Sequence, residues 1–313
     1  MGGHNAKVFA KALLIVLLAG CAHTPKQTFI VAHDPVMDQN GGVVLIADVC
    51  LQKDVVGDGD YFSIAESKEG AKALLASART YLREKQVSVR TELVPFVCGS
   101  LTHGNHVASF KVADRVGGET KQARPPFAVE PEIGEDPELL KALLTLSGEV
   151  YSRTAAQQPS NQAMQAKKGQ PQPPPFTVGA QELAEATQVV AEKMNASSVL
   201  YLGVNGTSIS TGKAVGQGLL SAAIGMATGV ATGVATHGHV YVMFFPGYSV
   251  DWRNMSCGLL NLEAGQCTWS SSVSGPGDPM KPKVVAEPRL VAGMLYGLVH
   301  KPAPQPTAPE KQR

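Results

Sequence analysis

The chain has 313 residues and a formal net charge of +1 at neutral pH, with 27 lysines and arginines against 26 acidic residues. This near-neutral balance does not provide the basic surface that nucleic-acid binding requires, so we expect no nucleic-acid partner. The length suffices for one large domain, and polar, proline-rich stretches indicate that some of the residues form linkers.

The N-terminal segment has basic residues first, then a short apolar run and then small residues. Lys7 and Lys11 precede the apolar run 12–18. That run is shorter than the roughly 20 residues that a membrane-spanning helix needs. The pattern is therefore typical of a signal peptide and not of a transmembrane anchor.

The apolar run ends in Leu18-Ala19-Gly20-Cys21, which resembles the lipobox of bacterial lipoproteins. In that family the cysteine thiol receives a diacylglycerol and the preceding peptide is removed. The resemblance implies a signal peptide at residues 1–20 and a membrane anchor at lipidated Cys21. Ala22 replaces the aspartate that retains such proteins at the inner membrane of enterobacteria, which favours the outer membrane and a domain facing the periplasm. The alternative is an ordinary secretory signal.

Residues 21–40 contain prolines and mixed polar residues, which are typical of a tether, and residues 41–300 are expected to form a single domain. That domain begins with the apolar run 42–50, a predicted strand that is buried on both faces. Helical spacing of apolar residues over 67–86, with Ser67 as the expected N-cap, and alternation over 87–97 complete a β-α-β unit.

Further elements follow along the chain. A helix capped by Asp136 and running to about Ser152 precedes a low-complexity insertion at 154–177, which cannot bury enough apolar surface to order itself. The other predicted elements are a helix at 181–195, strands at 198–204 and 239–245, a hairpin of 256–261 with 266–272, a helix at 284–300 and a disordered tail at 301–313. Together they predict an α/β fold with a mixed parallel and antiparallel sheet of about five strands and helices packed on it.

Two stretches resemble the curli-secretion-like periplasmic lipoproteins. Gln181-Glu182-Leu183-Ala184 leads a helix into the stretch 195–201, where the next strand begins, and a hairpin follows from Leu259 to Trp269. Asn261 and Ala264 depart from the acid and threonine usual in that turn. The resemblance implies a non-enzymatic accessory in envelope assembly or secretion, with envelope proteins or further copies of the chain as partners. Independently of the family, Trp269 on an alternating strand predicts packing on a sheet face.

With Cys21 lipidated, four cysteines remain in a compartment that permits disulfides, and they allow three pairings. Cys50 and Cys98 each lie at the end of a predicted strand. Parallel pairing of these two strands would place the two cysteines at similar heights in the sheet. Cys257 and Cys267 flank the hairpin, but a bulged turn would place Cys257 opposite Ser270 or Ser271. The choice among these possible disulfides stays open at this stage.

Residues 214–236 carry no charged side chain, and Gly225, Gly229 and Gly233 repeat every four residues. On a helix these glycines would share a face and allow a close approach of backbones. Three alternatives compete: contact with the membrane or with a second copy, packing against the chain's own sheet, or a flexible loop.

Three groups of residues raise the question of metal binding. His237 and His239 would share a strand face and could hold zinc, which gives the alternative function of a periplasmic metal- or ligand-binding protein, although no third ligand is evident. Cys98, His103 and His106 form a second, loosely spaced group, but an exported cysteine is more often oxidised than bound to a metal. The acidic group of Asp54, Asp58 and Asp60 lacks the final glutamate of a calcium-binding loop. We therefore expect no metal and no other cofactor.

No nucleophile, phosphate-loop or dinucleotide signature is recognisable in the sequence, so we expect the protein not to be an enzyme.

Overall fold

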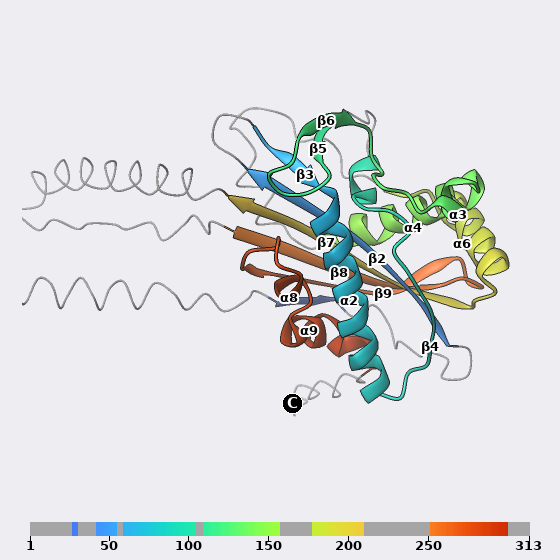
Figure 1. The fold of residues 1–313 in the computed structure, drawn as a ribbon. Coiled ribbons are helices and arrows are strands. Elements are labelled where there is room, and N and C mark those ends of the chain that lie inside the picture. The colour runs from blue at the N-terminus through green and yellow to red at the C-terminus, as the bar shows by residue number, and fades with distance from the viewer. Residues whose placement is uncertain are drawn as a thin grey trace, which may run out of the picture.

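A computed structural model of the chain describes residues 27–30, 42–54, 59–103, 109–156, 177–209 and 251–299. In these ranges one mixed sheet has nine strands, and helices pack on both of its faces (Figure 1). The strand order is β1-β9-β8-β7-β2-β3-β5-β6, and β4 also pairs with β2. The expected mixed α/β fold is therefore confirmed, with a larger sheet than the sequence indicated.

The centre of the sheet is β2 (Val43–Asp54), whose first nine residues are all buried. It runs parallel to β7 (Ser198–Ile209) and to the short β4 (Val89–Leu93). Between β2 and β4 lies α2 (Ile64–Glu84), which confirms the β-α-β unit. An apolar run without alternation suits β2 because both of its faces are covered.

The expected N-cap of α2 is wrong. The helix begins at Ile64, one turn before the expected start, and Ser67 lies inside it, fully buried. The Ser67 hydroxyl donates to the Ser63 carbonyl and accepts the Leu51 N–H at 3.1 Å. This serine therefore connects α2 to the central strand instead of starting the helix.

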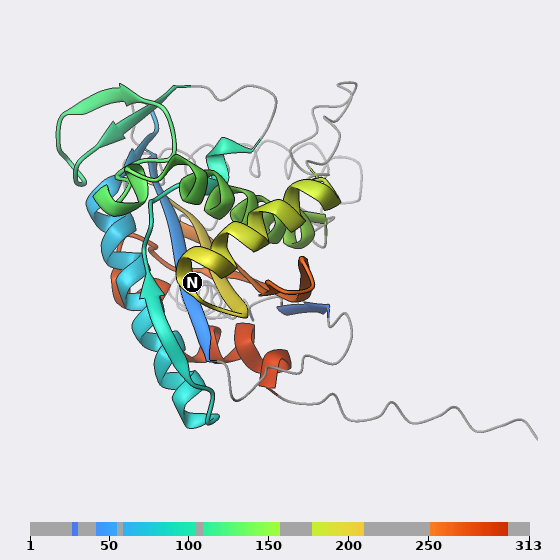
Figure 2. The ribbon, with the colours of Figure 1, turned by 90° about the vertical axis from the view of Figure 1, so that its right-hand side faces the viewer.

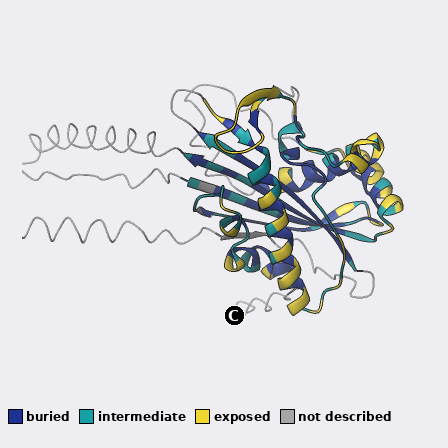
Figure 3. Cartoon of the chain, viewed as in Figure 1, coloured by how far each residue is buried: buried dark blue, intermediate teal, exposed yellow. Residues whose placement is uncertain are grey.

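Two helical layers cover the sheet (Figure 2). Alternate residues of β2 reach opposite layers: Leu45 belongs to the core under α2 and α9 (Pro288–Val299), and Ile46 belongs to the core under α4 (Pro137–Ala156) and α6 (Ala180–Met194). The short α3 (Pro131–Gly134) and α8 (Pro282–Val285) join the α4 and α9 layers respectively. Figure 3 shows the resulting dark band of buried residues through the strands.

The helix expected from Asp136 is confirmed. Asp136 Oδ1 accepts the Leu139 N–H at 3.0 Å, which is the contact of an N-cap residue. Thr154–Ala156, assigned to the low-complexity insertion, instead complete the last turn of α4.

The C-terminal hairpin consists of β8 (Asp251–Asn261) and β9 (Gln266–Pro276), with Gly265 at a φ of 63° in the turn. The register shifts between Leu259 and Leu260, so Cys257 lies opposite Ser271. Trp269 is buried in the core between the sheet and α9, as its place on an alternating strand predicts.

Two expectations need correction. The helix expected at 284–300 is divided into α8 and α9, because Pro288 lacks the N–H that a continuous helix would need and begins a new helix instead. Part of the expected tether is a strand, β1 (Gln27–Ile30), which pairs antiparallel with β9. The chain therefore joins the sheet only six residues after Cys21.

Three short strands were not expected: β3 (Tyr61–Ser63), β5 (Phe110–Ala113) and β6 (Thr120–Ala123). They extend the sheet beyond β2 on the side of its C-terminal half. The signal peptide, the glycine repeat, the strand expected at 239–245 and the tail at 301–313 lie outside the described residues.

Candidate functional site

One face of the sheet changes from apolar to polar along the direction of β2. Val44 and Ile46 lie under α4 and α6, whereas Asp48, Cys50 and Gln52 follow on the same face. The neighbouring strand β7 changes in the same way, from Val199 and Tyr201 to Asn205 and Thr207. The polar half of this face lies toward the end of the sheet at which β2 and β7 finish.

Asp48 lies at the transition and is only 3% exposed. Its Oδ1 accepts the Gly99 N–H and its Oδ2 accepts the Ser100 N–H and the Tyr201 hydroxyl, each at 3.1 Å. Burial raises the pKa of this carboxyl to about 6, and these hydrogen bonds oppose the rise. At neutral pH Asp48 is therefore mainly a carboxylate, held by two backbone amides and a phenol.

The turn that Asp48 holds is also fixed covalently. Cys98 has a φ of 59°, in the left-handed region, and forms a disulfide with Cys50, two residues after Asp48 on β2. A short 3-10 helix, η1 (Gly99–Thr102), starts directly after it. A Cβ at Gly99 would lie 2.2 Å from the Phe96 ring, so only glycine fits there. The disulfide and the aspartate together position the side chains of η1.

A cleft of about 260 Å³ lies over the polar half of the face. Its lining includes residues of β2, β7 and β8 and is completed by η1, the end of α4 and β3. Amide and hydroxyl side chains provide its polar groups, namely Gln52, Ser100, Thr154, Asn205, Thr207, Asn254 and Ser256. Ser100 Oγ donates to Asn205 Oδ1 at 3.1 Å, which links η1 to β7 across the cleft.

Two aromatic rings also line the cleft. Phe62 comes from β3 and is half-buried, and Tyr151 comes from α4 and is 39% exposed. The residues that line the cleft carry no formal charge. The cleft thus combines neutral hydrogen-bonding groups with aromatic surface, and Asp48 supports it from below without lining it.

The disulfide predictions have a clear outcome. Cys50 pairs with Cys98, whereas Cys257 and Cys267 are free and buried. The pairing of Cys257 with Cys267 is wrong because the two side chains belong to cores on opposite faces of the sheet. A disulfide between them would have to pass through the backbone.

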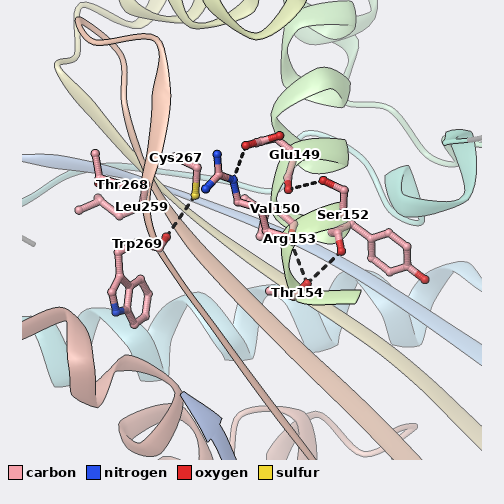
Figure 4. A network of polar contacts seen from close by, with 10 residues as sticks. Glu149, Val150, Ser152, Arg153, Thr154, Leu259, Cys267, Thr268 and Trp269 are labelled. Atoms are coloured by element: carbon pink, nitrogen blue, oxygen red, sulfur yellow. Dashed lines mark hydrogen bonds and ion pairs between the residues drawn. The ribbon is translucent and has the colours of Figure 1, made fainter. Parts of the chain in front are cut away.

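The Cys267 thiol lies beside the last turns of α4 (Figure 4). It donates a weak hydrogen bond to the Trp269 carbonyl at 3.2 Å, and Glu149 and Arg153 form an ion pair nearby. Burial raises the pKa of Cys267 to about 11 and raises that of Cys257 well above its ordinary value. Both thiols are therefore protonated and unreactive at neutral pH.

Most of the remaining candidate site residues lie outside the described part of the chain, namely Cys21, Asp58, His106, Gly225, Gly229, Gly233, His237 and His239. Cys98 is oxidised, as expected for an exported cysteine, so its thiol is not available as a ligand beside His103. Within the described ranges, no three histidine, cysteine or acidic residues gather as metal ligands.

The helices described in the structure include none with both the length and the apolar character needed to cross a bilayer.

Sequence reasoning missed the residues that form the cleft. Asp48 could have indicated a polar site in the sequence, because an acid inside an otherwise apolar strand must be hydrogen-bonded once it is buried. Asn205 and Asn254 were harder to recognise as site residues, since both lie outside the strands predicted at 198–204 and 256–261.

Comparison with known proteins gives a limited result. No protein-family model matches the sequence, and no curated protein matches it significantly. Two solved structures of the PelC dodecamer from Paraburkholderia phytofirmans resemble the chain weakly, over 89% of its length and 99% of theirs. A leucine-to-methionine variant has 11% identity and a TM-score of 0.31, and a second crystal form has 10% identity and a TM-score of 0.30.

Proposed function

We propose that the chain is a lipid-anchored protein of the bacterial outer membrane that faces the periplasm and acts as a non-enzymatic accessory in envelope assembly or secretion. The observation that carries the proposal is Leu18-Ala19-Gly20-Cys21 after a short apolar run. Acyl chains on this cysteine would hold the domain at one leaflet, because each buried CH₂ contributes about 0.8 kcal/mol.

The Cys50–Cys98 disulfide supports an exported location. Structural disulfides persist in the periplasm and outside the cell, whereas the bacterial cytosol keeps thiols reduced. This bridge spans 48 residues and fixes a wall of the cleft, so it belongs to the folded architecture. A chain with a lipobox and such a bridge fits export followed by lipidation.

The position of β1 indicates how the anchor would hold the domain. Gln27 pairs with Val273 of β9, and β1 runs antiparallel to β9. Gln27, the first residue of β1, therefore lies toward the end of the sheet at which β9 finishes. Six residues reach about 20 Å when extended, so lipidated Cys21 would keep this end of the sheet close to the membrane surface.

The same end of the sheet is where the chain leaves β7 at Ile209 and returns to β8 at Asp251. Ser208 pairs directly with Asp251, so the two ends of the intervening segment are adjacent. This segment contains the Gly225, Gly229 and Gly233 repeat, which we propose contacts the membrane or a second copy of the chain.

A non-enzymatic role is consistent with the chemistry around Asp48. A catalytic acid or base must have an oxygen within reach of a substrate proton. The two Asp48 oxygens instead accept from Gly99, Ser100 and Tyr201 and are buried below the cleft. We therefore assign Asp48 a structural role.

Metabolic labelling with an alkyne-bearing palmitate tests the anchor. The full-length chain is expected to incorporate the label and to fractionate with outer membranes, and Cys21→Ser is expected to lose both properties. Ala22→Ser, which keeps the thiol, is the matched control and should retain the label. Labelling that persists in Cys21→Ser, or an unlabelled chain in the soluble periplasmic fraction, would overturn the proposal.

Self-association is tested separately by crosslinking in cells. A Gly225→Leu, Gly229→Leu, Gly233→Leu chain is expected to show fewer crosslinked multimers or easier extraction from membranes. Unchanged multimers together with unchanged extraction would remove the role proposed for the repeat.

A further inference from the structure

We propose that the polar cleft binds a neutral, polyhydroxylated ligand and accommodates one sugar unit of a glycan. This binding role depends on the cleft lining alone and is independent of the lipid anchor. It concerns residues that face one side of β2, β7 and β8, at the end of the sheet where β2 and β7 finish.

The polar side chains form rows across these three strands. Cys50 lies opposite Asn205, and Asn205 lies opposite Asn254, while Gln52 lies opposite Thr207 in the next row. Neighbouring strands are about 4.8 Å apart, and successive rows on one face are about 7 Å apart. The floor of the cleft therefore presents side-chain amides and hydroxyls in two rows across these strands.

Amide side chains suit hydroxyl groups because they both donate and accept. A sugar hydroxyl needs an acceptor for its proton and a donor for its lone pairs, and asparagine or glutamine offers both without a charge. Asn205 already accepts from Ser100 Oγ, which holds its side chain over the floor. Such prior ordering reduces the entropy lost when a ligand binds.

The aromatic groups supply the apolar part of such a site. Tyr151 remains 39% exposed at the end of α4 although it lines the cleft, and Phe62 lines it from β3. The C–H groups of a pyranose ring form a flat apolar surface that packs on an aromatic ring. Small-ligand sites typically combine aromatic surface with a few placed polar groups in this way.

Charge argues against ionic ligands. The lining residues carry no charged group that could neutralise a bound phosphate or carboxylate. Asp48 lies in the row next to Cys50, buried beneath the cleft, and its carboxylate would repel an anion. Its two oxygens already accept three hydrogen bonds, so they are poorly placed to receive a cation.

The size favours one sugar unit. The cleft has a volume of about 260 Å³. This volume lies below the range of about 300–1,000 Å³ typical of sites for drug-sized ligands. A longer glycan would therefore place one unit in the cleft and extend outward from it.

Saturation-transfer NMR on the full-length chain in detergent tests the proposal, with tri-N-acetylglucosamine as the neutral probe and trigalacturonate as the anionic probe. We expect saturation transfer to the neutral probe and at least tenfold weaker binding of the anionic one. Asn205→Ala, Asn254→Ala and Tyr151→Ala should each weaken binding of the neutral probe at least tenfold, while Gln188→Ala and Tyr296→Ala, exposed residues on α6 and α9, should leave it unchanged.

Circular dichroism of each variant verifies that the fold is retained. Absence of transfer to the neutral probe, unchanged affinity in the three cleft variants, or binding of trigalacturonate as tight as that of the neutral probe would overturn the proposal. The Cys21→Ser chain keeps the whole cleft and should bind the sugar normally. Failure of the anchor and failure of the cleft are thus separate results.

Discussion

Asp48 and Cys50 lie two residues apart on the same face of β2, and both hold the turn that begins at Cys98. Asp48 accepts the N–H groups of Gly99 and Ser100, and Cys50 forms the disulfide with Cys98. One restraint is electrostatic and the other covalent. Because they act on the same few residues, their contributions to stability should be coupled.

Replacing the disulfide by Cys50→Ser with Cys98→Ser should lower the free energy of unfolding by about 4 kcal/mol, since the bridge closes a loop of 48 residues in the unfolded chain. Urea unfolding of the full-length chain measures this change. When the double-serine change is combined with Asp48→Asn, the change in the free energy of unfolding should differ from the sum of the separate changes. Strict additivity would show that the two restraints act independently.

The pH dependence of the free energy of unfolding should reflect the titration of Asp48. Its folded pKa of about 6 lies above the ordinary value of 3.8, so the folded state favours the protonated form. The contribution of Asp48 to the free energy of unfolding is fully present below pH 3.8 and is lost as the pH rises through about 6. The loss amounts to about 3 kcal/mol. Urea unfolding between pH 4 and 7.5 should show that Asp48→Asn is stabilised relative to wild type as pH rises.

Asp136→Asn provides a control of opposite sign. The Asp136 carboxylate accepts a hydrogen bond from Lys193, which lowers its pKa, so its stabilisation is present above 3.8 and lost as pH falls through the folded pKa. Asp136→Asn should therefore lose stability at neutral pH. A carboxyl NMR signal of Asp48 that titrates below pH 4 would show that burial does not raise the pKa of this group.

Much of the fold could be predicted from the sequence because the pattern of its longer elements is local. The apolar run of β2, the helical periodicity of α2 and α6 and the turn at Gly265 each depend on neighbouring residues. The strands that were missed, β1, β3, β5 and β6, have only three or four residues each. A pattern of alternation cannot be recognised over so short a length.

The candidate site was harder to predict because its residues are distant in sequence. Asp48 acquires its role from Gly99 and Ser100, about 50 positions later, and from Tyr201, 153 positions later. The cleft likewise requires that Asn205 and Asn254 become neighbours through strand pairing. Local periodicity predicts the strands, but it does not fix which residues meet across them.

Packing of α4 on the hairpin should depend on the absence of a side chain at Gly258. A Cβ there would lie 2.6 Å from Val150 Cγ2, so Gly258→Ala should destabilise the fold by about 1–3 kcal/mol through overpacking. Val150→Ala in the same chain removes the clash and should recover part of the loss. Gly134→Ala is the control, because its new Cβ would meet Val129 only at 3.7 Å. Equal effects of Gly258→Ala and Gly134→Ala on urea unfolding would be inconsistent with this packing.

Alkylation counts should distinguish the three classes of cysteine. In the native, unreduced protein we expect no modification by iodoacetamide, because Cys50 and Cys98 are bridged and Cys257 and Cys267 are buried thiols with raised pKa values. Unfolding without reductant should expose two reactive thiols, and unfolding with reductant should expose four. Mass spectrometry counts the added groups.

The same experiment on the Cys21→Ser chain should give the same counts, because an acylated Cys21 does not react. If the wild-type chain gains one group more than Cys21→Ser at each step, Cys21 carries a free thiol and is not lipidated. If unfolding without reductant exposes no thiol, Cys257 and Cys267 are oxidised, which would contradict their separation on opposite faces of the sheet.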